Sequence, residues 1–134
     1  MTDVYDMNVT VLRRNSARDS KFPKGLSFLQ FDLDSLSNHL KAMKNTLLIQ
    51  STSAPLSGHS LKELCPAIEF LDGAFVDLVY KNPSDLFYEA ERRGLPCIDG
   101  LPMLVEQAVL SQKYWWGTSV DSDLVYDFID KYGV

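Results

Sequence analysis

The chain has 134 residues, of which 46% are hydrophobic and 23% are charged, so one globular domain with a sizeable core is expected. Its formal net charge of −5 argues against a nucleic-acid-binding surface, which requires a positive field. The apolar runs are too short to cross a bilayer, and the acidic, polar start shows no signal-peptide pattern. We therefore expect a cytoplasmic protein without a nucleic-acid or membrane partner.

Neither the cysteines nor the histidines have the spacing of a metal or catalytic site. Cys65 and Cys97 stand far apart, without a Cys-x-x-Cys pattern, and are expected to be free thiols. His39 and His59 are isolated, so we assign neither of them a metal-binding or catalytic role.

Residues 8–12 form a short β-branched run that predicts the first strand. Arg13, Arg14 and Arg18 follow it in an otherwise acidic chain. The residues alone leave two interpretations equally open. One is a solvated turn, and the other is an anion site, because guanidinium groups bind phosphate through paired hydrogen bonds.

Further along the chain, residues 26–31 predict a second strand. Asp34 or Ser35 is then expected to cap a helix. The apolar run 46–50 does not alternate with polar residues, which predicts a parallel strand covered on both faces.

Small hydroxyl residues at 51–53 follow the third strand, where open α/β sheets bind ligands, although such residues also form turns. After a loop with some helical character, residues 74–80 predict a fourth strand, residues 85–93 a short helix and residues 96–98 a last short strand. Strands that alternate with helices indicate an α/β fold with a mostly parallel sheet.

Residues 99–117 organise the carboxyl-terminal part of the chain. Asp99-Gly100 predicts a tight turn, Pro102 suits the first turn of a helix, and Gly117 predicts its end. Because this helix is apolar nearly all round, we expect it to be buried on most sides. Gln107 either forms a polar edge of the helix or presents its amide to a ligand. A final helix over residues 122–132 carries one apolar stripe.

Several of these segments together resemble shikimate dehydrogenase, in collinear order from residue 8 almost to the end. The first strand with its arginines resembles an Asn-Arg-Thr-x-x-Arg segment of that family, and residues 49–53 resemble its Ile-Asn-Ala-Thr segment. The other motifs that carry the resemblance are Asp77-Leu78-Val79-Tyr80, Gly94, residues 99–108 and Trp116-Gly117.

The resemblance covers only the carboxyl-terminal half of the family. It implies an incomplete Rossmann-like, three-layer dinucleotide-binding fold over residues 1–134, which lacks the first strand, its Gly-rich turn and the substrate domain. It also implies the family's reaction, the reduction of 3-dehydroshikimate to shikimate with NADPH in aromatic amino-acid biosynthesis.

The same resemblance implies a role for each matching residue. Arg14 and Arg18 match the residues that hold the 2′-phosphate of NADP, and Arg13 stands where the family usually has asparagine. The other residues expected near the cofactor NADP are Thr52, Leu78, Gly100 and Met103. Those expected to hydrogen-bond the hydroxyls of a shikimate-like molecule are Tyr80 and Gln107.

Two positions depart from the family pattern. Gln50 replaces asparagine, and Pro102 replaces a glycine, which removes one amide donor. The sequence also contains no G-x-G-x-x-G pattern, and no segment matches the catalytic Lys-Asp pair, so no catalytic residue is assigned.

Three explanations of the partial match remain open. The chain is a fragment, or it is half of a split enzyme whose other half is a separate polypeptide, or it is a remodelled domain in which strands 8–12 and 46–50 pair directly. Uncovered strand edges also favour self-association. A non-catalytic binding or assembly module is the alternative function.

Overall fold

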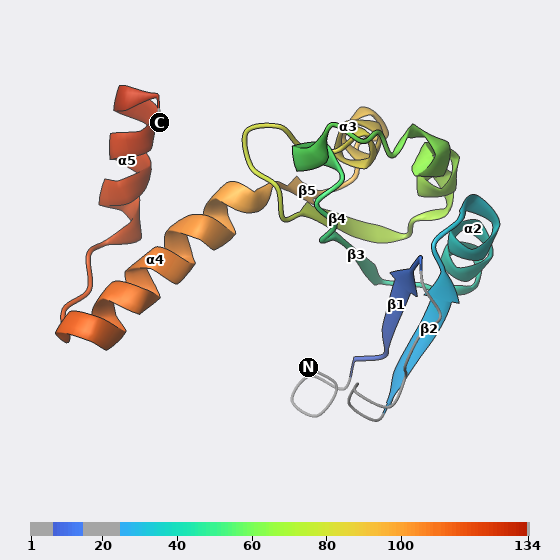
Figure 1. Ribbon diagram of the computed structural model, residues 1–134, viewed down its shortest axis with the longest axis horizontal. Coiled ribbons are helices and arrows are strands. Elements are labelled where there is room, and N and C mark those ends of the chain that lie inside the picture. Colours follow the sequence, from blue (N-terminus) through green and yellow to red (C-terminus); the bar gives the residue numbers. More distant parts are fainter. Residues whose placement is uncertain (1–6, 15–24, 134) are drawn as a thin grey trace.

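The computed structural model describes residues 7–14 and 25–133, which form two parallel sheets and the helices around them (Figure 1). In the first sheet, β1 (Val9–Arg13) pairs with β2 (Leu26–Gln30). The second sheet has the order β3 (Thr46–Gln50), β4 (Gly73–Asp77) and β5 (Cys97–Ile98). All pairings are parallel, which confirms the predicted α/β fold.

The two sheets do not join within the described residues, because β1 pairs only with β2 and β3 only with β4. In the common dinucleotide-binding fold the strand order is 3-2-1-4-5-6. The observed β2-β1 and β3-β4-β5 correspond to strands 3-2 and 4-5-6 of that order, with the place of strand 1 open between β1 and β3. Direct pairing of these two strands in a remodelled domain is therefore wrong.

The core lies between the second sheet and a layer formed by α2 (Leu33–Ala42), the 3-10 segment η3 (Lys62–Phe70) and α3 (Asp85–Arg92). Phe75 of β4 is fully buried at its centre. The other large apolar side chains that are fully buried are Leu40, Leu61, Leu64 and Ile68.

Strand β3 is covered on one face only, so the prediction that both faces are covered is wrong. Leu48 packs against the core, whereas Leu47 and Ile49 are 43% and 42% exposed. Successive side chains of a strand point to opposite faces, and the helices that pack on this part of the sheet lie on the side of Leu48.

The cap of α2 also differs from the prediction. Asp32, and neither Asp34 nor Ser35, is the N-cap, since its carboxylate accepts a hydrogen bond from the Ser35 N–H at 2.7 Å. The residue at N-cap must lie outside the helix, and Asp34 already belongs to its first turn. The fourth strand is likewise shorter than predicted, because Asp77 ends it by binding the backbone of the following turn.

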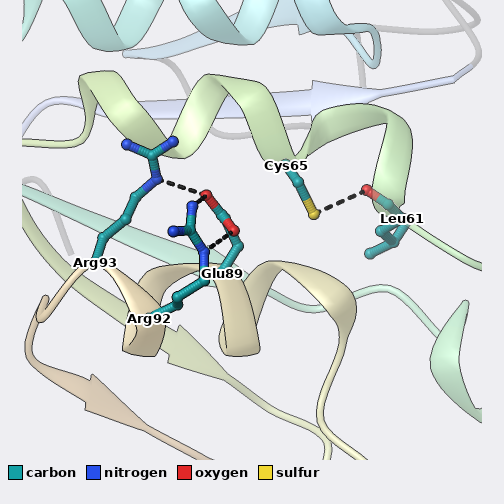
Figure 2. Close-up of polar contacts among 5 residues, drawn as sticks. All are labelled: Leu61, Cys65, Glu89, Arg92 and Arg93. Carbon is teal, nitrogen blue, oxygen red and sulfur yellow. Dashed lines mark hydrogen bonds and ion pairs between the residues drawn. The ribbon is translucent and has the colours of Figure 1, made fainter.

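A polar cluster at the carboxyl-terminal end of α3 lies between α3 and η3 (Figure 2). Glu89 accepts hydrogen bonds from Nε and Nη2 of Arg92 at 2.9 and 2.7 Å and from Nε of Arg93 at 2.6 Å. The bonds from Arg92 and Arg93 lower the pKa of Glu89 from 4.5 to about 2. On η3, the thiol of Cys65 donates to the Leu61 carbonyl, and burial raises the pKa of that thiol.

Both cysteines are free, as predicted. None of the helices in residues 7–14 and 25–133 combines the length and the apolar character that crossing a bilayer requires.

Helices α4 (Gly100–Trp116) and α5 (Ser122–Tyr132) contact each other and extend away from the two sheets (Figure 1). The predicted burial of α4 is wrong: only Gly100 and Val105 are buried, and Trp115 is 68% exposed. An apolar sequence shows that a helix needs cover, but among the described residues α5 is the main element that contacts α4.

Candidate functional site

A cavity of about 400 Å³ opens at the carboxyl ends of β1 and β3. Three residues predicted to bind a cofactor, Arg13, Arg14 and Thr52, line it together. They come from two different sheets, so the cavity bridges the open place in the strand order. Arg18, predicted to act with them, lies outside the described residues.

Each described arginine of this cavity lies over an aromatic ring. The guanidinium carbon of Arg13 lies 4.3 Å from the ring centroid of Phe28, and that of Arg14 lies 5.5 Å from the ring centroid of Phe31. The Gln30 side-chain amide also donates to the Arg14 carbonyl at 3.4 Å. A cation over a ring face is attracted by the ring electrons, so these contacts hold the guanidinium groups at the end of the sheet.

Gln50 shapes the loop that carries Thr52. Its side-chain oxygen accepts a hydrogen bond from the Thr52 N–H, and its side-chain amide donates to Oδ1 of Asp77 at 3.3 Å. The Thr52 hydroxyl in turn accepts the Ala54 N–H at 3.3 Å. The glutamine that departs from the family's asparagine therefore bridges β3 and β4 while it orders the cavity wall.

Asp77 is the fully buried residue that connects the two parts of the candidate site. Besides Gln50, its carboxyl group accepts the Val79 N–H at 2.9 Å and the Ser84 N–H at 2.7 Å. These bonds compensate for the burial of the carboxyl group. The sequence analysis missed this role, although an Asp at a strand end commonly binds the backbone N–H two residues on.

A second group of residues predicted to lie near the cofactor, Leu78 and Gly100, is found where β4 meets α4. The Leu78 N–H donates to the Gln50 carbonyl at 3.0 Å, and the Gly100 N–H donates to the Val79 carbonyl at 3.4 Å. A Cβ atom on Gly100 would lie 2.3 Å from the Leu78 carbonyl oxygen.

Glycine at position 100 is therefore required by close approach to Leu78, whereas the sequence analysis placed it in a turn. Gly100 is in fact the first residue of α4, and Asp99 caps the helix by accepting the Leu101 N–H at 3.0 Å. The predicted end of the helix at Gly117 is confirmed, since that residue has φ 71°.

The residues predicted to bind substrate are exposed around this junction. Tyr80 is 39% exposed and its backbone lies beside Gly100. Met103, which is 45% exposed, and Gln107 are four residues apart on α4 and so share one face of it. Within the described residues, no hydrogen bond joins the side chains of Tyr80 and Gln107, so their role in substrate binding stays a prediction.

His59, to which the sequence pattern assigned no role, lines the cavity with the arginines. A turn over residues 54–58 brings it there, closed by the His59 N–H donating to the Ala54 carbonyl at 2.8 Å. No local pattern could indicate this, because only the return of the loop places His59 near β1. In the part of the chain that the structure describes, no group of three or more His, Cys, Asp or Glu residues could hold a metal ion.

No family model matches the chain, but curated relatives do. It is 38% identical over 82 residues to shikimate dehydrogenase (NADP(+)) of Thermus thermophilus, which is 60% of this chain and 31% of that protein. It is 30% identical over 106 residues to the protein of the same name from Streptococcus suis, which is 77% of this chain and 36% of that one. The chain thus spans about a third of the length of these relatives.

Solved structures show the same partial match. A chorismate mutase/shikimate 5-dehydrogenase fusion protein from Clostridium acetobutylicum superposes with a TM-score of 0.69 at 26% identity, over 92% of this chain and 43% of that one. Shikimate dehydrogenase from Aquifex aeolicus has a TM-score of 0.69 at 21% identity, over 90% and 43%. The Thermus thermophilus enzyme in complex with NADP(H) and shikimate has a TM-score of 0.52 at 29% identity, over 74% and 35%. The predicted Rossmann-like fold is confirmed.

Proposed function

We propose that this chain, which is similar to one part of shikimate dehydrogenases, is the NADP-binding portion of an oxidoreductase of that type. The observation that carries the proposal is that Arg13, Arg14 and Thr52 meet at one cavity. Open α/β sheets bind ligands at the carboxyl ends of their strands, where the strand order reverses. The cavity has this location.

The residues of the cavity fit the phosphate groups of a dinucleotide. Arginine offers paired N–H donors to a phosphate, and the side chains of Thr52, Ser53 and Ser57 add hydroxyl donors. In a chain of net charge −5, two arginines that are adjacent in the sequence also give this edge a local positive field. We assign the 2′-phosphate to Arg14 and Arg18, the role that the family resemblance implies, while Arg13 adds positive charge.

The junction of β4 and α4 supplies the other end of the proposed site. When bound there, NADPH would supply the hydride that reduces the carbonyl carbon of 3-dehydroshikimate. Leu78 and Gly100 would form the surface against which the nicotinamide ring lies, with Met103 beside it. Tyr80 and Gln107 would orient the hydroxyl groups of a shikimate-like ligand, since a phenol and an amide can donate and accept hydrogen bonds.

In our proposal, a residue outside this sequence transfers the proton. None of the positions that match the family carries its catalytic lysine or aspartate, so we expect no turnover by the 134-residue chain alone. Measurable NADP-dependent oxidation of shikimate by the pure chain would contradict this. A cytoplasmic location and a place in aromatic amino-acid biosynthesis go with the family assignment as parts of the same proposal.

Thermal unfolding with and without NADP tests the cofactor site. A ligand that binds only the folded state adds about 2.7 kcal/mol of stability at a hundredfold excess over its Kd. We expect NADP to raise the melting temperature, and NAD, which lacks the 2′-phosphate, to raise it less. Equal shifts with the two dinucleotides, or none with either, would overturn the assignment of the arginines.

One observation favours a second function, a non-catalytic binding or assembly module. Helices α4 and α5 expose Tyr114, Trp116 and Phe128, which are 88%, 69% and 56% exposed. Aromatic side chains of this kind are enriched in protein interfaces. A chain that self-associates or binds a protein partner through these helices, and whose melting does not respond to NADP, would support the module instead of the cofactor-binding portion.

A further inference from the structure

His59 is an exposed residue that lines the cavity together with Arg13 and Arg14. Its backbone N–H is bonded to the Ala54 carbonyl, but among the described residues no hydrogen bond or ion pair engages its imidazole ring. The ring nitrogens are therefore available to a ligand that enters the cavity.

Contacts on both sides of His59 fix the course of its loop. On one side, the His59 N–H donates to the Ala54 carbonyl at 2.8 Å and closes the preceding turn. On the other side, Asp85 of α3 accepts the Ser60 hydroxyl at 2.7 Å and the Leu61 N–H at 2.8 Å. These bonds hold the backbone of His59 beside the cavity before any ligand binds, so little conformational freedom is lost when its side chain contacts one.

Charged groups lie on both sides of this loop in the part of the chain that the structure describes. Arg13 and Arg14, from the end of β1, line the same cavity as His59. Behind the loop lie Asp85 of α3 and Lys62 at the start of η3, whose N–H donates to the Ser60 hydroxyl at 3.2 Å. The hydrogen bond from Ser60 lowers the pKa of Asp85, so that carboxyl group stays ionised and bound to the loop. The described residues that line the cavity itself include no carboxylate.

We infer that His59 is a third cationic residue of the anion site, and that its protonated imidazole binds the 2′-phosphate of NADP together with the arginines. The inference deepens the proposed function and rests on it for the identity of the ligand. Both nitrogens of a protonated imidazole donate hydrogen bonds, and phosphate oxygens accept such bonds strongly.

This role makes the preference for NADP depend on pH. An arginine stays charged at every pH of interest, whereas a histidine changes its charge between about pH 5 and pH 8. A bound phosphate group favours the protonated imidazole, so binding of NADP takes up a proton at His59. The contribution of His59 to affinity is present at the acidic end of this range and is lost as the pH rises.

Isothermal titration calorimetry of the 134-residue chain at about pH 6.5 and about pH 8.5 tests the inference. We expect His59→Asn to raise the Kd for NADP about tenfold at the lower pH and less than about threefold at the higher one, with little change in the Kd for NAD. His59→Arg keeps a cation at this position, so it should bind NADP tightly at both pH values. An unchanged Kd for NADP in His59→Asn, or an equal loss with NAD, would overturn the inference.

His39→Asn is the matched control, because His39 is the other histidine of the sequence and lies on α2, away from the cavity. It should change neither dissociation constant at either pH. The melting temperature of each variant shows that the fold is kept, as expected for the exposed His59.

Proton uptake is a second measurement that needs no variant. The heat of NADP binding is compared at about pH 7.5 in buffers that differ in their enthalpy of ionisation. A phosphate monoester with a pKa of about 6 has already lost both protons at this pH, so a proton that is taken up enters the protein. We expect uptake with NADP and less with NAD. No uptake with NADP, or uptake that persists in His59→Asn, would refute the role of His59.

These assays separate the inference from the proposed function. If NADP binds more tightly than NAD and Arg14→Ala weakens its binding, but His59→Asn does not, the proposed function holds and the inference fails. If the chain binds neither dinucleotide, both fail.

Discussion

The side-chain amide of Gln50 donates a hydrogen bond to Asp77, and this contact joins the loop beside the arginine-lined cavity to the end of β4. Asp77 continues the connection to Val79 and Ser84, and so to the junction with α4. The two halves of the candidate site are therefore held together by buried polar contacts and not by packing alone.

Replacing Asp77 by alanine tests this connection. The change leaves the Val79 and Ser84 N–H groups without their acceptor, and each such loss costs about 1–3 kcal/mol. We expect the free energy of unfolding in urea to fall by about 3 kcal/mol or more. Asp72→Ala is the control, because the ion pair of Asp72 with Lys44 is exposed and its removal should cost less than about 1 kcal/mol. Equal losses in the two variants would contradict the role of Asp77.

Replacing Gly100 by alanine tests the close approach of α4 to β4. The new Cβ would overlap the Leu78 carbonyl oxygen at 2.3 Å, so the first turn of α4 must shift. We expect a loss of about 2–3 kcal/mol in the free energy of unfolding. Gly117→Ala is the control that separates the effect of steric overlap from the effect of backbone conformation. Gly117 has φ 71°, but no atom lies within 4 Å of a Cβ atom added there. It should cost only about 1 kcal/mol, and a larger loss at position 117 than at position 100 would refute the argument.

Replacing Arg14 by alanine should reduce binding of NADP more than binding of NAD. A hydrogen bond to a charged group contributes about 1.5–3 kcal/mol, so the Kd for NADP should rise roughly tenfold or more while that for NAD changes little. Isothermal titration calorimetry measures both constants. Arg92→Ala removes a guanidinium group that pairs with Glu89 outside the cavity, and it should leave both constants unchanged.

Lowering the pH should reduce the stability that the hydrogen bonds of Glu89 with Arg92 and Arg93 give to the fold. Hydrogen bonds from Arg92 and Arg93 lower the pKa of Glu89 from 4.5 to about 2 in the folded chain. A lowered folded-state pKa gives stability that is present above the unfolded pKa and is lost as the pH falls through the folded pKa. Between about pH 5 and pH 2, the stability of Glu89→Gln should therefore depend less on pH than that of the parent chain.

Unfolding free energies across this pH range, measured with urea, provide the comparison. Glu91→Gln on the same helix is the control, because no ion pair engages Glu91 among the described residues. If the free energy of unfolding has the same pH dependence in Glu89→Gln and Glu91→Gln, the hydrogen bonds of Glu89 do not stabilise the fold in this pH range.

The sequence predicted best those features that depend on neighbouring residues. The third strand has the predicted bounds, and so does α5 with its C-cap at Gly133. The start and end of α4 lie within two residues of the predicted ones. Caps, turn residues and hydrophobic periodicity act locally, so they can be read without knowledge of the fold.

Features that depend on distant segments could not be predicted in this way. The apolar pattern of α4 indicates a need for cover but not whether the described chain provides it. Gly100 requires a glycine because of Leu78, which lies on another element, and His59 reaches the cavity only through the return of a loop. For the candidate site, the family resemblance indicated which residues to examine, whereas the network of Gln50 and Asp77 emerged only from the three-dimensional arrangement.

The two-stranded sheet of β1 and β2 has a consequence for cooperativity. A pair of strands is only marginally stable unless further elements support it. Arg13 ends β1, and β1 also lines one side of a groove between the two sheets. NADP bound at the arginine-lined cavity would therefore order β1, and a contact that orders β1 would tighten the binding of NADP by the same factor, because such coupling is reciprocal. The order of β1 and the affinity for the cofactor would then rise together.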